Sequence, residues 1–325
     1  MRHLLLGAAA VAAALTLTAC GTTEPTADDA GKKSDPVTLT GASGKKVELD
    51  APAKRVVGTE WHEVELLVSL GVDPVGVADV KGYRTWDTAV PLKNEPRDIG
   101  TRGEPSMDTV AALKPDLVVA STDLPPKAVK QLRRIAPVLE VRSADASDPI
   151  GHMKDNLDLV AEATGTTKRA EKLKQDFDAH LADGRKTLAD AGLEGAEYAF
   201  ADGYVNSNQV SIRPYTSGSL TGAVNGKLGL KNDWKVEGDK AYGLGSTDVE
   251  GLTELDDDVH FAYIGNDGDK SSTPFTGALA DDSVWKSLPF VKKGNVHRLP
   301  DGIWMFGGPE SMNQYIDAVV EALAE

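Results

Sequence analysis

A long helical pattern, TTKRAEKLKQDFDAHLADGRKTLAD, occupies residues 166–190. Its apolar residues recur at spacings of three, four and seven, the period of one buried helix face. They are Ala170, Leu173, Phe177, Leu181 and Leu188. The charged remainder is typical of a solvated face. A second helical pattern, residues 151–164, comes before it, and Gly165 separates the two. We interpret residues 166–190 as one long helix that joins two lobes.

Strand and helix patterns alternate before this pair of helices. The predicted strands are residues 55–57, 75–77, 117–120 and 138–141, and the predicted helices are residues 61–70, 107–113 and 127–135. Residues 37–49 alternate around two glycines, which predicts a small hairpin. The alternation favours an α/β fold with a mostly parallel central sheet.

The second half of the chain repeats features of the first half. The segment that starts at Asp108 and the segment that starts at Glu250 share an acid, an apolar residue, a leucine and an aspartate at equal spacings, followed by a strand pattern. Residues 70–72 and 228–230 likewise share a Leu-Gly-apolar sequence. Two matches in the same order indicate two lobes of similar topology. Small ligands commonly bind in the cleft between such lobes.

The N-terminus has the features of a lipoprotein leader. Arg2 precedes an apolar stretch that ends in Leu17-Thr-Ala-Cys20, which resembles a lipobox. Cys20 is the only cysteine, so no internal disulfide is expected. The predicted organisation is a signal peptide (1–19), the lipidated Cys20 with a flexible tether (20–36), an N-terminal lobe (37–165), a linking helix (166–191) and a C-terminal lobe (192–325).

The composition and the motifs favour ligand binding over catalysis or nucleic-acid binding. The 325 residues include 35 basic and 50 acidic side chains, for a net charge of −15. Contacts with nucleic-acid phosphates need clustered Lys and Arg, so no nucleic-acid partner is expected. No GxSxG, HExxH, P-loop or strand-associated GxGxxG motif occurs. The acids and His62 in residues 60–65 raise the question of a metal site, but residues two apart on a helix point in different directions.

Aromatic and arginine side chains follow the ends of several predicted strands. The candidate ligand-binding residues are Trp61, Trp86, Arg102, Arg213, Tyr215, Trp304 and Phe306. We expect Tyr83 and Trp86 in a loop after residues 75–77. The carboxyl ends of parallel strands form the ligand edge of open α/β sheets. A pocket of this composition suits a bulky, partly apolar ligand with acceptor oxygens, because arginine presents a planar set of donors.

Several segments resemble the ferric hydroxamate-binding, ferrichrome-type members of the cobalamin- and siderophore-binding family, which serve ABC importers. These segments are TEWHEVELLVSLGVDPVGVAD (59–79), YRTW (83–86), IGTRGEP (99–105), WKSLPF (285–290) and IWMFG (303–307). The resemblance runs from about residue 53 to the C-terminus. It implies two α/β lobes joined by one long helix, in agreement with the helical pattern described above.

The resemblance also implies a ligand. An iron(III)-hydroxamate siderophore, of ferrioxamine or ferrichrome type, would lie among the candidate aromatic residues, and Arg102 would donate to the oxygens around the iron. We infer from their placement that Arg213 and Tyr215 supply donors from the other lobe. The siderophore itself surrounds the iron, so neither a protein metal ligand nor a cofactor is expected. The chain departs from the ferrichrome-type pattern at residues 121–124, which lack a tyrosine.

The partners implied by the resemblance are an ABC permease dimer and a membrane. Asp108 and Glu250 match the positions at which the family meets arginines of the permease. An alternative role for both acids is a favourable charge at a helix N-terminus. The lipid on Cys20 would hold the protein, expected to be a monomer, at the extracytoplasmic face of the cell membrane.

Other functions remain open at this stage. A haem- or cobalamin-binding protein would keep the fold, and haem would require an axial ligand such as His62 or Tyr215. A surface enzyme would need a nucleophile with its base, or a flavin site, and no such pattern occurs in the sequence. A structural lipoprotein would leave the loop tryptophans unexplained.

Overall fold

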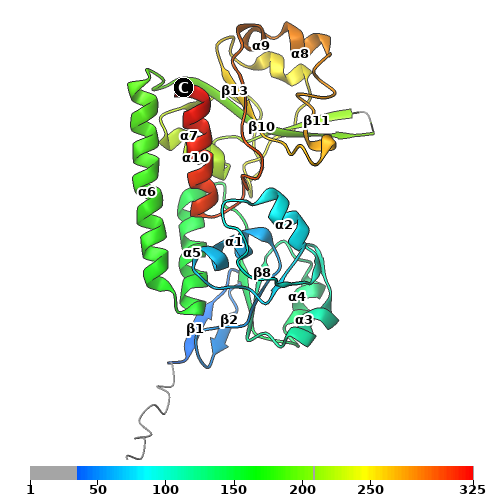
Figure 1. The fold of residues 1–325 in the computed structure, drawn as a ribbon, viewed down its shortest axis with the longest axis vertical. Helices are drawn as coiled ribbons and strands as arrows, with labels where there is room; N and C mark the ends of the chain where they lie inside the picture. The colour runs from blue at the N-terminus through cyan, green and yellow to red at the C-terminus, as the bar shows by residue number, and fades with distance from the viewer. Residues whose placement is uncertain (1–34, 208, 325) are drawn as a thin grey trace, which may run out of the picture. The chain divides into compact units, whose positions relative to one another are not determined.

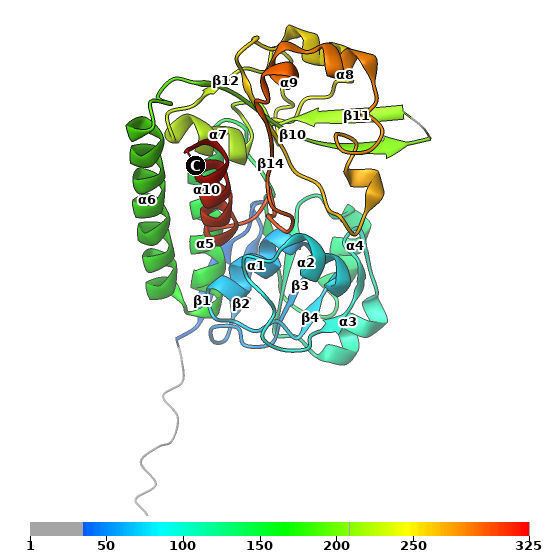
Figure 2. The ribbon, with the colours of Figure 1, turned by 45° about the horizontal axis from the view of Figure 1, so that its top comes forward.

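The computed structural model describes residues 35–207 and 209–324. They form two α/β lobes (Figures 1 and 2), so the predicted fold class is confirmed. The predicted signal peptide, Cys20 and the tether up to residue 34 lie outside the described residues. Within these two ranges, no helix is both long enough and apolar enough to cross a membrane.

The first lobe contains a parallel sheet with the strand order β5-β4-β3-β8-β9. Its strands are β3 (Val56–Gly58), β4 (Gly76–Val77), β5 (Arg97–Asp98), β8 (Leu117–Ser121) and β9 (Val138–Val141). Successive side chains of a strand face opposite sides. Val56 accordingly packs in one core and Val57 in another, so both faces of the sheet are covered. The predicted hairpin precedes the sheet as β1 (Val37–Thr40) and β2 (Lys46–Leu49).

Four short helices and a hairpin connect the strands of the first lobe. They are α1 (Trp61–Ser69), α2 (Val80–Trp86), α3 (Met107–Leu113), α4 (Pro126–Leu132) and the hairpin of β6 (Gly100–Thr101) with β7 (Glu104–Pro105). Leu66 of α1 packs on the same side of the sheet as Val56. Val110 of α3 and Val129 of α4 pack on the opposite side. The sheet is thus held between two helical layers.

The prediction of a loop around Tyr83 and Trp86 is wrong, because both residues lie in α2. Asp79 caps this helix from a left-handed conformation (φ 51°), and its carboxylate accepts a hydrogen bond from the backbone N–H of Gly82 at 3.0 Å. A Cβ at position 82 would come within 2.2 Å of Asp79 and of the Trp61 ring. Glycine is therefore required there. Because glycine disfavours helices and α2 has only seven residues, the sequence gives little indication of a helix at this place.

The two long predicted helices are present as α5 (Pro149–Thr164) and α6 (Thr167–Asp190). Gly165 ends α5 in a left-handed conformation, with φ 71°. Leu173 of α6 packs in the core of the first lobe, whereas Phe177 packs in the core of the second. One helix therefore joins the lobes, as the sequence predicts, and Figure 1 shows it running beside both.

The second lobe contains a mixed sheet with the order β11-β10-β13-β14, and β12 also pairs with β10. Its strands are β10 (Glu197–Asn206), β11 (Gln209–Pro214), β12 (Lys231–Asn232), β13 (His260–Tyr263) and β14 (Val296–Arg298). Only β11 pairs in the antiparallel direction. The helices are α7 (Leu220–Lys227), α8 (Ser283–Ser287), α9 (Pro289–Lys293), α10 (Pro309–Ala324) and the 3-10 turns η1 (Glu250–Glu254) and η2 (Lys270–Ser272).

The internal repeat corresponds to similar local structure in the two lobes. Gly71 and Gly229 both have positive φ, 81° and 91°, directly after the capping residues of α1 and α7. Asp108 lies in the first turn of an α-helix, whereas Glu250 begins a 3-10 turn of five residues. The two lobes therefore share the helix end at the repeated glycine. The helix that begins near Asp108 corresponds to a shorter 3-10 turn in the second lobe.

Candidate ligand-binding site

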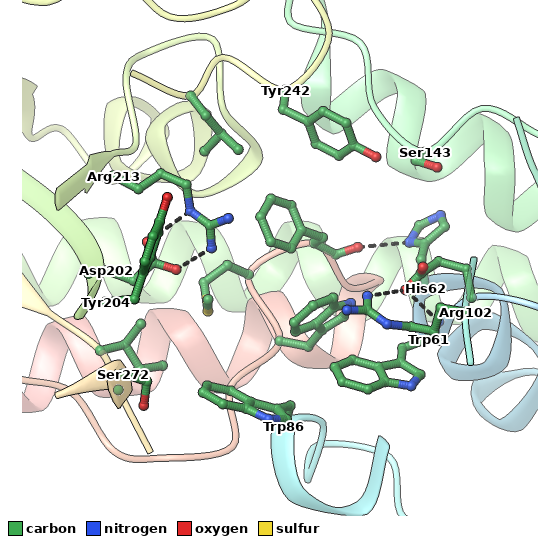
Figure 3. Close-up of a pocket in the computed structure, with 18 residues that line it drawn as sticks. Trp61, His62, Trp86, Arg102, Ser143, Asp202, Tyr204, Arg213, Tyr242 and Ser272 are labelled. Carbon is green, nitrogen blue, oxygen red and sulfur yellow. Dashed lines mark hydrogen bonds and ion pairs between the residues drawn. The ribbon is translucent and has the colours of Figure 1, made fainter. Parts of the chain in front are cut away.

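A cavity of about 510 Å³ lies between the lobes, and both lobes line it (Figure 3). Six of the seven predicted ligand-binding residues line this cavity. They are Trp61, Trp86, Arg102, Arg213, Trp304 and Phe306. The sequence prediction thus identified most of the chemically distinctive side chains of the cavity, although their role in binding stays a prediction.

Indole and phenyl rings form one wall of the cavity. The Trp61 and Trp304 ring centroids are 4.8 Å apart with an interplanar angle of 67°, and those of Trp304 and Phe306 are 5.1 Å apart. Trp61 donates through Nε1 to the carbonyl oxygen of Ala78 at 3.2 Å, which fixes its ring. Trp304 is 8% exposed, and its Nε1 has no hydrogen-bond partner among the described residues. The wall therefore offers a large apolar contact area, and the unpartnered Nε1 of Trp304 is buried within it.

Arg102 lies in the turn between β6 and β7 and extends across the aromatic wall. Its guanidinium carbon is 3.9 Å from the Trp61 ring centroid and 5.5 Å from that of Trp304. Its Nη1 donates to Oε1 of Glu60 at 2.7 Å, and Glu60 is the N-cap of α1. Stacking and the ion pair together hold the guanidinium in one orientation, with further N–H donors available.

Arg213 occupies the corresponding position in the second lobe. It lies on β11 directly opposite Asp202 of β10, and its Nε donates to Oδ1 of Asp202 at 2.8 Å. Its Nη2 bonds to the second oxygen of the same carboxylate. Its guanidinium carbon is 5.5 Å from the Phe306 ring centroid. This arginine is therefore held by a two-bond carboxylate contact beside an aromatic ring.

Tyr215 does not line the cavity, which corrects its predicted role as a ligand contact. It is 1% exposed, and its hydroxyl donates to Asp202 at 3.2 Å and accepts from Nη2 of Arg213 at 3.3 Å. β11 ends at Pro214, and Tyr215 is the next residue. The guanidinium carbon of Arg213 lies 5.8 Å from the centroid of the Tyr215 ring. Tyr215 lies behind the arginine and supports its orientation.

His62 is a neutral structural residue at the edge of the cavity. Its Nδ1 lies 3.0 Å from the carbonyl oxygen of Phe306, and its Nε2 lies 3.2 Å from Nδ2 of Asn156. The carbonyl requires a donor, so Nδ1 carries the proton and Nε2 accepts from the amide. Burial lowers the pKa of His62 to about 4. Nδ1 therefore holds α1 against the segment that carries Phe306, and Nε2 holds α1 against α5.

Further contacts fasten the segment of residues 302–311 to the first lobe. The backbone N–H of Thr88 donates to the carbonyl oxygen of Gly302 at 2.9 Å. The buried Glu65 carboxylate accepts from the backbone N–H of Ser311 at 3.0 Å and from its hydroxyl at 2.8 Å. Because these bonds flank Trp304, they fix its position relative to Trp61.

Tyr242 comes from the second lobe and lines the cavity, and it was not predicted from the sequence. Its hydroxyl donates to the carboxylate of Asp123 in the first lobe, and its ring packs edge-on against Phe306 with centroids 5.6 Å apart. Asp123 lies in the segment that lacks the tyrosine of the ferrichrome-type pattern. Tyr242 belongs to a long loop anchored by the Asp239 side chain, and no strand or helix pattern drew attention to it.

Residues 56–302 match a family whose description is periplasmic binding protein. The chain belongs to the periplasmic binding protein family. Among its relatives in this family, a probable siderophore-binding lipoprotein of Bacillus subtilis is 28% identical over 94% of each chain. The iron(3+)-hydroxamate-binding protein of Escherichia coli is 26% identical over 83% of this chain and 86% of its own. The resemblance recognised in the sequence is thereby confirmed.

The solved structures agree with this fold assignment. The siderophore-binding protein of Vibrio cholerae with bound Fe³⁺-Desferal superimposes with a TM-score of 0.71, at 24% identity, over 83% of this chain and 98% of its own. Other similar proteins are named for ferric citrate and for the triscatecholate ferri-bacillibactin. Likeness within this family therefore does not by itself select the iron chelator.

The two acids predicted to dock on the permease are both exposed. Asp108 lies on α3 in the first lobe, and Glu250 lies on η1 in the second. Each is thus accessible on its own lobe of this periplasmic binding protein, as a docking contact requires. Contact of these acids with a permease stays a prediction.

Proposed function

We propose that this protein is an extracytoplasmic, lipid-anchored substrate-binding protein that captures an iron(III)-hydroxamate siderophore between its lobes and delivers it to an ABC importer. Support for siderophore transport comes from its family and from relatives named for siderophore or iron(3+)-hydroxamate binding. The Cys20 lipid anchor, the permease contacts of Asp108 and Glu250, and the monomeric state belong to the same proposal. The protein acts by binding and release, without catalysis.

The observation that carries the proposal is the composition of the cavity. Three indoles and Phe306 offer apolar contact, while Arg102 and Arg213 offer planar N–H donors. The described residues contain no group of three or more His, Cys, Asp or Glu side chains that could hold a metal ion. These features suit iron that arrives inside a complete chelate with carbon on its outside and acceptor oxygens around the metal.

A hydroxamate chelate fits this cavity by charge as well as by shape. Three hydroxamates carry one negative charge each and together balance Fe³⁺, so their complex is neutral unless a side arm adds a charge. Arginine N–H groups can donate to the hydroxamate oxygens without meeting a large net charge. This charge balance favours the hydroxamate class and leaves ferrioxamine and ferrichrome types equally acceptable.

The haem alternative receives less support from the described residues. Both nitrogens of His62 are engaged, one with the Phe306 carbonyl and one with Asn156. Tyr215 is buried, and its hydroxyl is engaged with Asp202 and Arg213. Neither of the two side chains considered as an axial ligand is therefore free to meet a haem iron in the cavity.

The test is a tryptophan-fluorescence titration of the chain that starts after Cys20, with ferrichrome, ferrioxamine, a ferric triscatecholate, haem and cobalamin. We expect saturable quenching by the hydroxamates and a loss of affinity of about tenfold or more in Arg102→Ala, because a charge-assisted bond is lost. Arg134→Ala is the matched control, since Arg134 is exposed and lies outside the cavity. A response to haem or cobalamin with none to hydroxamates would overturn the ligand assignment.

A further inference from the structure

Each arginine of the cavity is paired with a carboxylate from its own lobe. In the first lobe, Glu60 accepts from Arg102 at 2.7 Å. In the second lobe, Asp202 accepts from Arg213 through two bonds, one of them 2.8 Å long. Figure 3 shows the two arginines on opposite sides of the cavity. The arrangement is therefore the same in both lobes: an arginine, an acid and an adjacent aromatic ring.

The charges of these four side chains cancel within the cavity wall. Two guanidinium groups face two carboxylates. His62 is the other lining side chain that can carry a positive charge, and it is neutral because burial lowers its pKa to about 4. The acids are well covered, with 21% of the Glu60 side chain and 14% of the Asp202 side chain exposed. Solvent therefore screens them incompletely, and their charge acts on a ligand in the cavity.

We propose that Glu60 and Asp202 determine which ferric complexes the cavity accepts, by neutralising its arginines. This inference rests on the proposed siderophore function and specifies its ligand class by net charge. Neutral complexes add no uncompensated charge to this wall, and a complex with one positive charge adds only one. A triscatecholate complex carries three negative charges, since three doubly charged ligands surround Fe³⁺, and it would lose hydration without finding a net positive wall.

The two acids also position the arginines. Each carboxylate holds one edge of a guanidinium, and the ring below it holds the flat face. The remaining N–H donors then point in a fixed direction, which lowers the entropic cost of binding acceptor oxygens. Glu60→Gln separates this positioning role from the charge filter, because one amide oxygen can still accept the single bond from Arg102. Asp202→Asn removes the same charge but keeps only one of the two acceptors that hold Arg213.

The experiment uses Glu60→Gln, Asp202→Asn and the double variant. Ferrichrome serves as the neutral probe, ferrioxamine B as the cationic probe and ferri-bacillibactin as the trianionic probe. We expect wild type to bind ferrichrome and ferrioxamine B at least about a hundredfold more tightly than ferri-bacillibactin. Each single variant should reduce this preference about tenfold, chiefly through tighter ferri-bacillibactin binding, and the gain should shrink at high salt.

Glu95→Gln is the matched control, because Glu95 forms a similar ion pair with Arg84 on the surface and does not line the cavity. It should leave all three affinities unchanged. Equal binding of ferri-bacillibactin and ferrichrome by wild type, or variants that leave the preference unchanged while ferrichrome still binds, would overturn the charge filter alone. Failure of wild type to bind any hydroxamate would instead overturn the proposed function on which the filter rests.

Discussion

Glu63 is fully buried on α1, and neither oxygen of its carboxyl group has a hydrogen-bond partner among the described residues. Burial raises its pKa well above the usual value, and the negative charges of Glu60 and Asp123 act in the same direction. A glutamate with a raised pKa in the folded state binds its proton more tightly there than in the unfolded chain, where its pKa is near 4.3. Its contribution to the free energy of unfolding is therefore complete below about pH 4.3. That contribution is lost as the pH rises through the folded-state pKa.

Glu63→Gln should therefore stabilise the protein at neutral and higher pH. Glutamine keeps the shape and removes the group that must stay protonated, so we expect a gain of about 1–3 kcal/mol near pH 8 and little difference near pH 4. Thermal unfolding followed by circular dichroism over this pH range provides the measurement. Glu48→Gln serves for comparison: its side chain is exposed on β2, so no gain from removing a buried acid is expected there. A Glu63→Gln variant with the pH profile of wild type would contradict the assignment.

Tyr215 and Arg213 should differ in their effect on ligand binding, because only the arginine faces the cavity. Tyr215→Phe removes one hydroxyl behind Arg213 and should weaken hydroxamate binding by a few-fold at most. Arg213→Ala removes the donor itself and should weaken binding by about tenfold or more. Fluorescence titration of both variants with ferrichrome measures the difference. Equal losses in the two variants would indicate that the tyrosine contacts the siderophore directly.

At the scale of elements, glycine determines how helices of both lobes end. Gly229 has a φ of 91° directly after α7, where a side chain is strained whatever the space around it. Gly226 lies inside the same helix, and a Cβ there would meet no atom within 4 Å. The two positions therefore make opposite demands on the residue that occupies them.

Gly229→Ala should destabilise the protein by about 1–2 kcal/mol, the cost of a left-handed conformation for a residue with a side chain. Gly226→Ala should stabilise it by up to about 1 kcal/mol, because alanine favours the helix. Chemical denaturation of the two variants, measured side by side, tests the pair. The opposite order of stability would show that α7 does not end at this glycine.

At the scale of the whole described unit, side-chain hydrogen bonds join one lobe to the other. Tyr242 of the second lobe donates to Asp123 of the first. Nδ2 of Asn266, also in the second lobe, donates to the carbonyl oxygen of Thr85 at 3.2 Å. Separation of the lobes to release a bound siderophore would have to break these bonds.

Tyr242→Phe should therefore increase the rate of siderophore dissociation by a few-fold, with a smaller change in the association rate. Stopped-flow fluorescence with ferrioxamine B measures both rates. Tyr204→Phe is the control, since Tyr204 also lines the cavity but has no inter-lobe hydrogen bond among the described residues. An unchanged dissociation rate in Tyr242→Phe would show that the inter-lobe bond does not restrain the ligand.

Docking on the permease can be separated from ligand binding. Asp108→Ala and Glu250→Ala remove exposed acids that lie outside the cavity. We expect unchanged affinity for ferrichrome and a lower rate of iron uptake in cells, with a larger loss in the double variant. Uptake of labelled ferrichrome by cells that carry each variant is the measurement. Normal uptake by the double variant would exclude these acids as docking residues.

The sequence by itself determined the elements whose signals are local. The period of apolar residues fixes α6, and Gly165 and Gly71 mark helix ends, because backbone conformation and helix periodicity depend on near neighbours in the chain. It also identified the cavity indoles and arginines, since these residue types follow strand ends.

Only the tertiary structure decided which groups those residues meet. Glu60 and Arg102 are 42 residues apart, and Asp123 and Tyr242 are 119 apart, so no periodicity relates them. Tyr215 was misplaced because packing buries it against Asp202 and Arg213, so that the arginine lies between it and the cavity. The pairing of each arginine with an acid, and with it the charge of the cavity, arises from packing between distant segments.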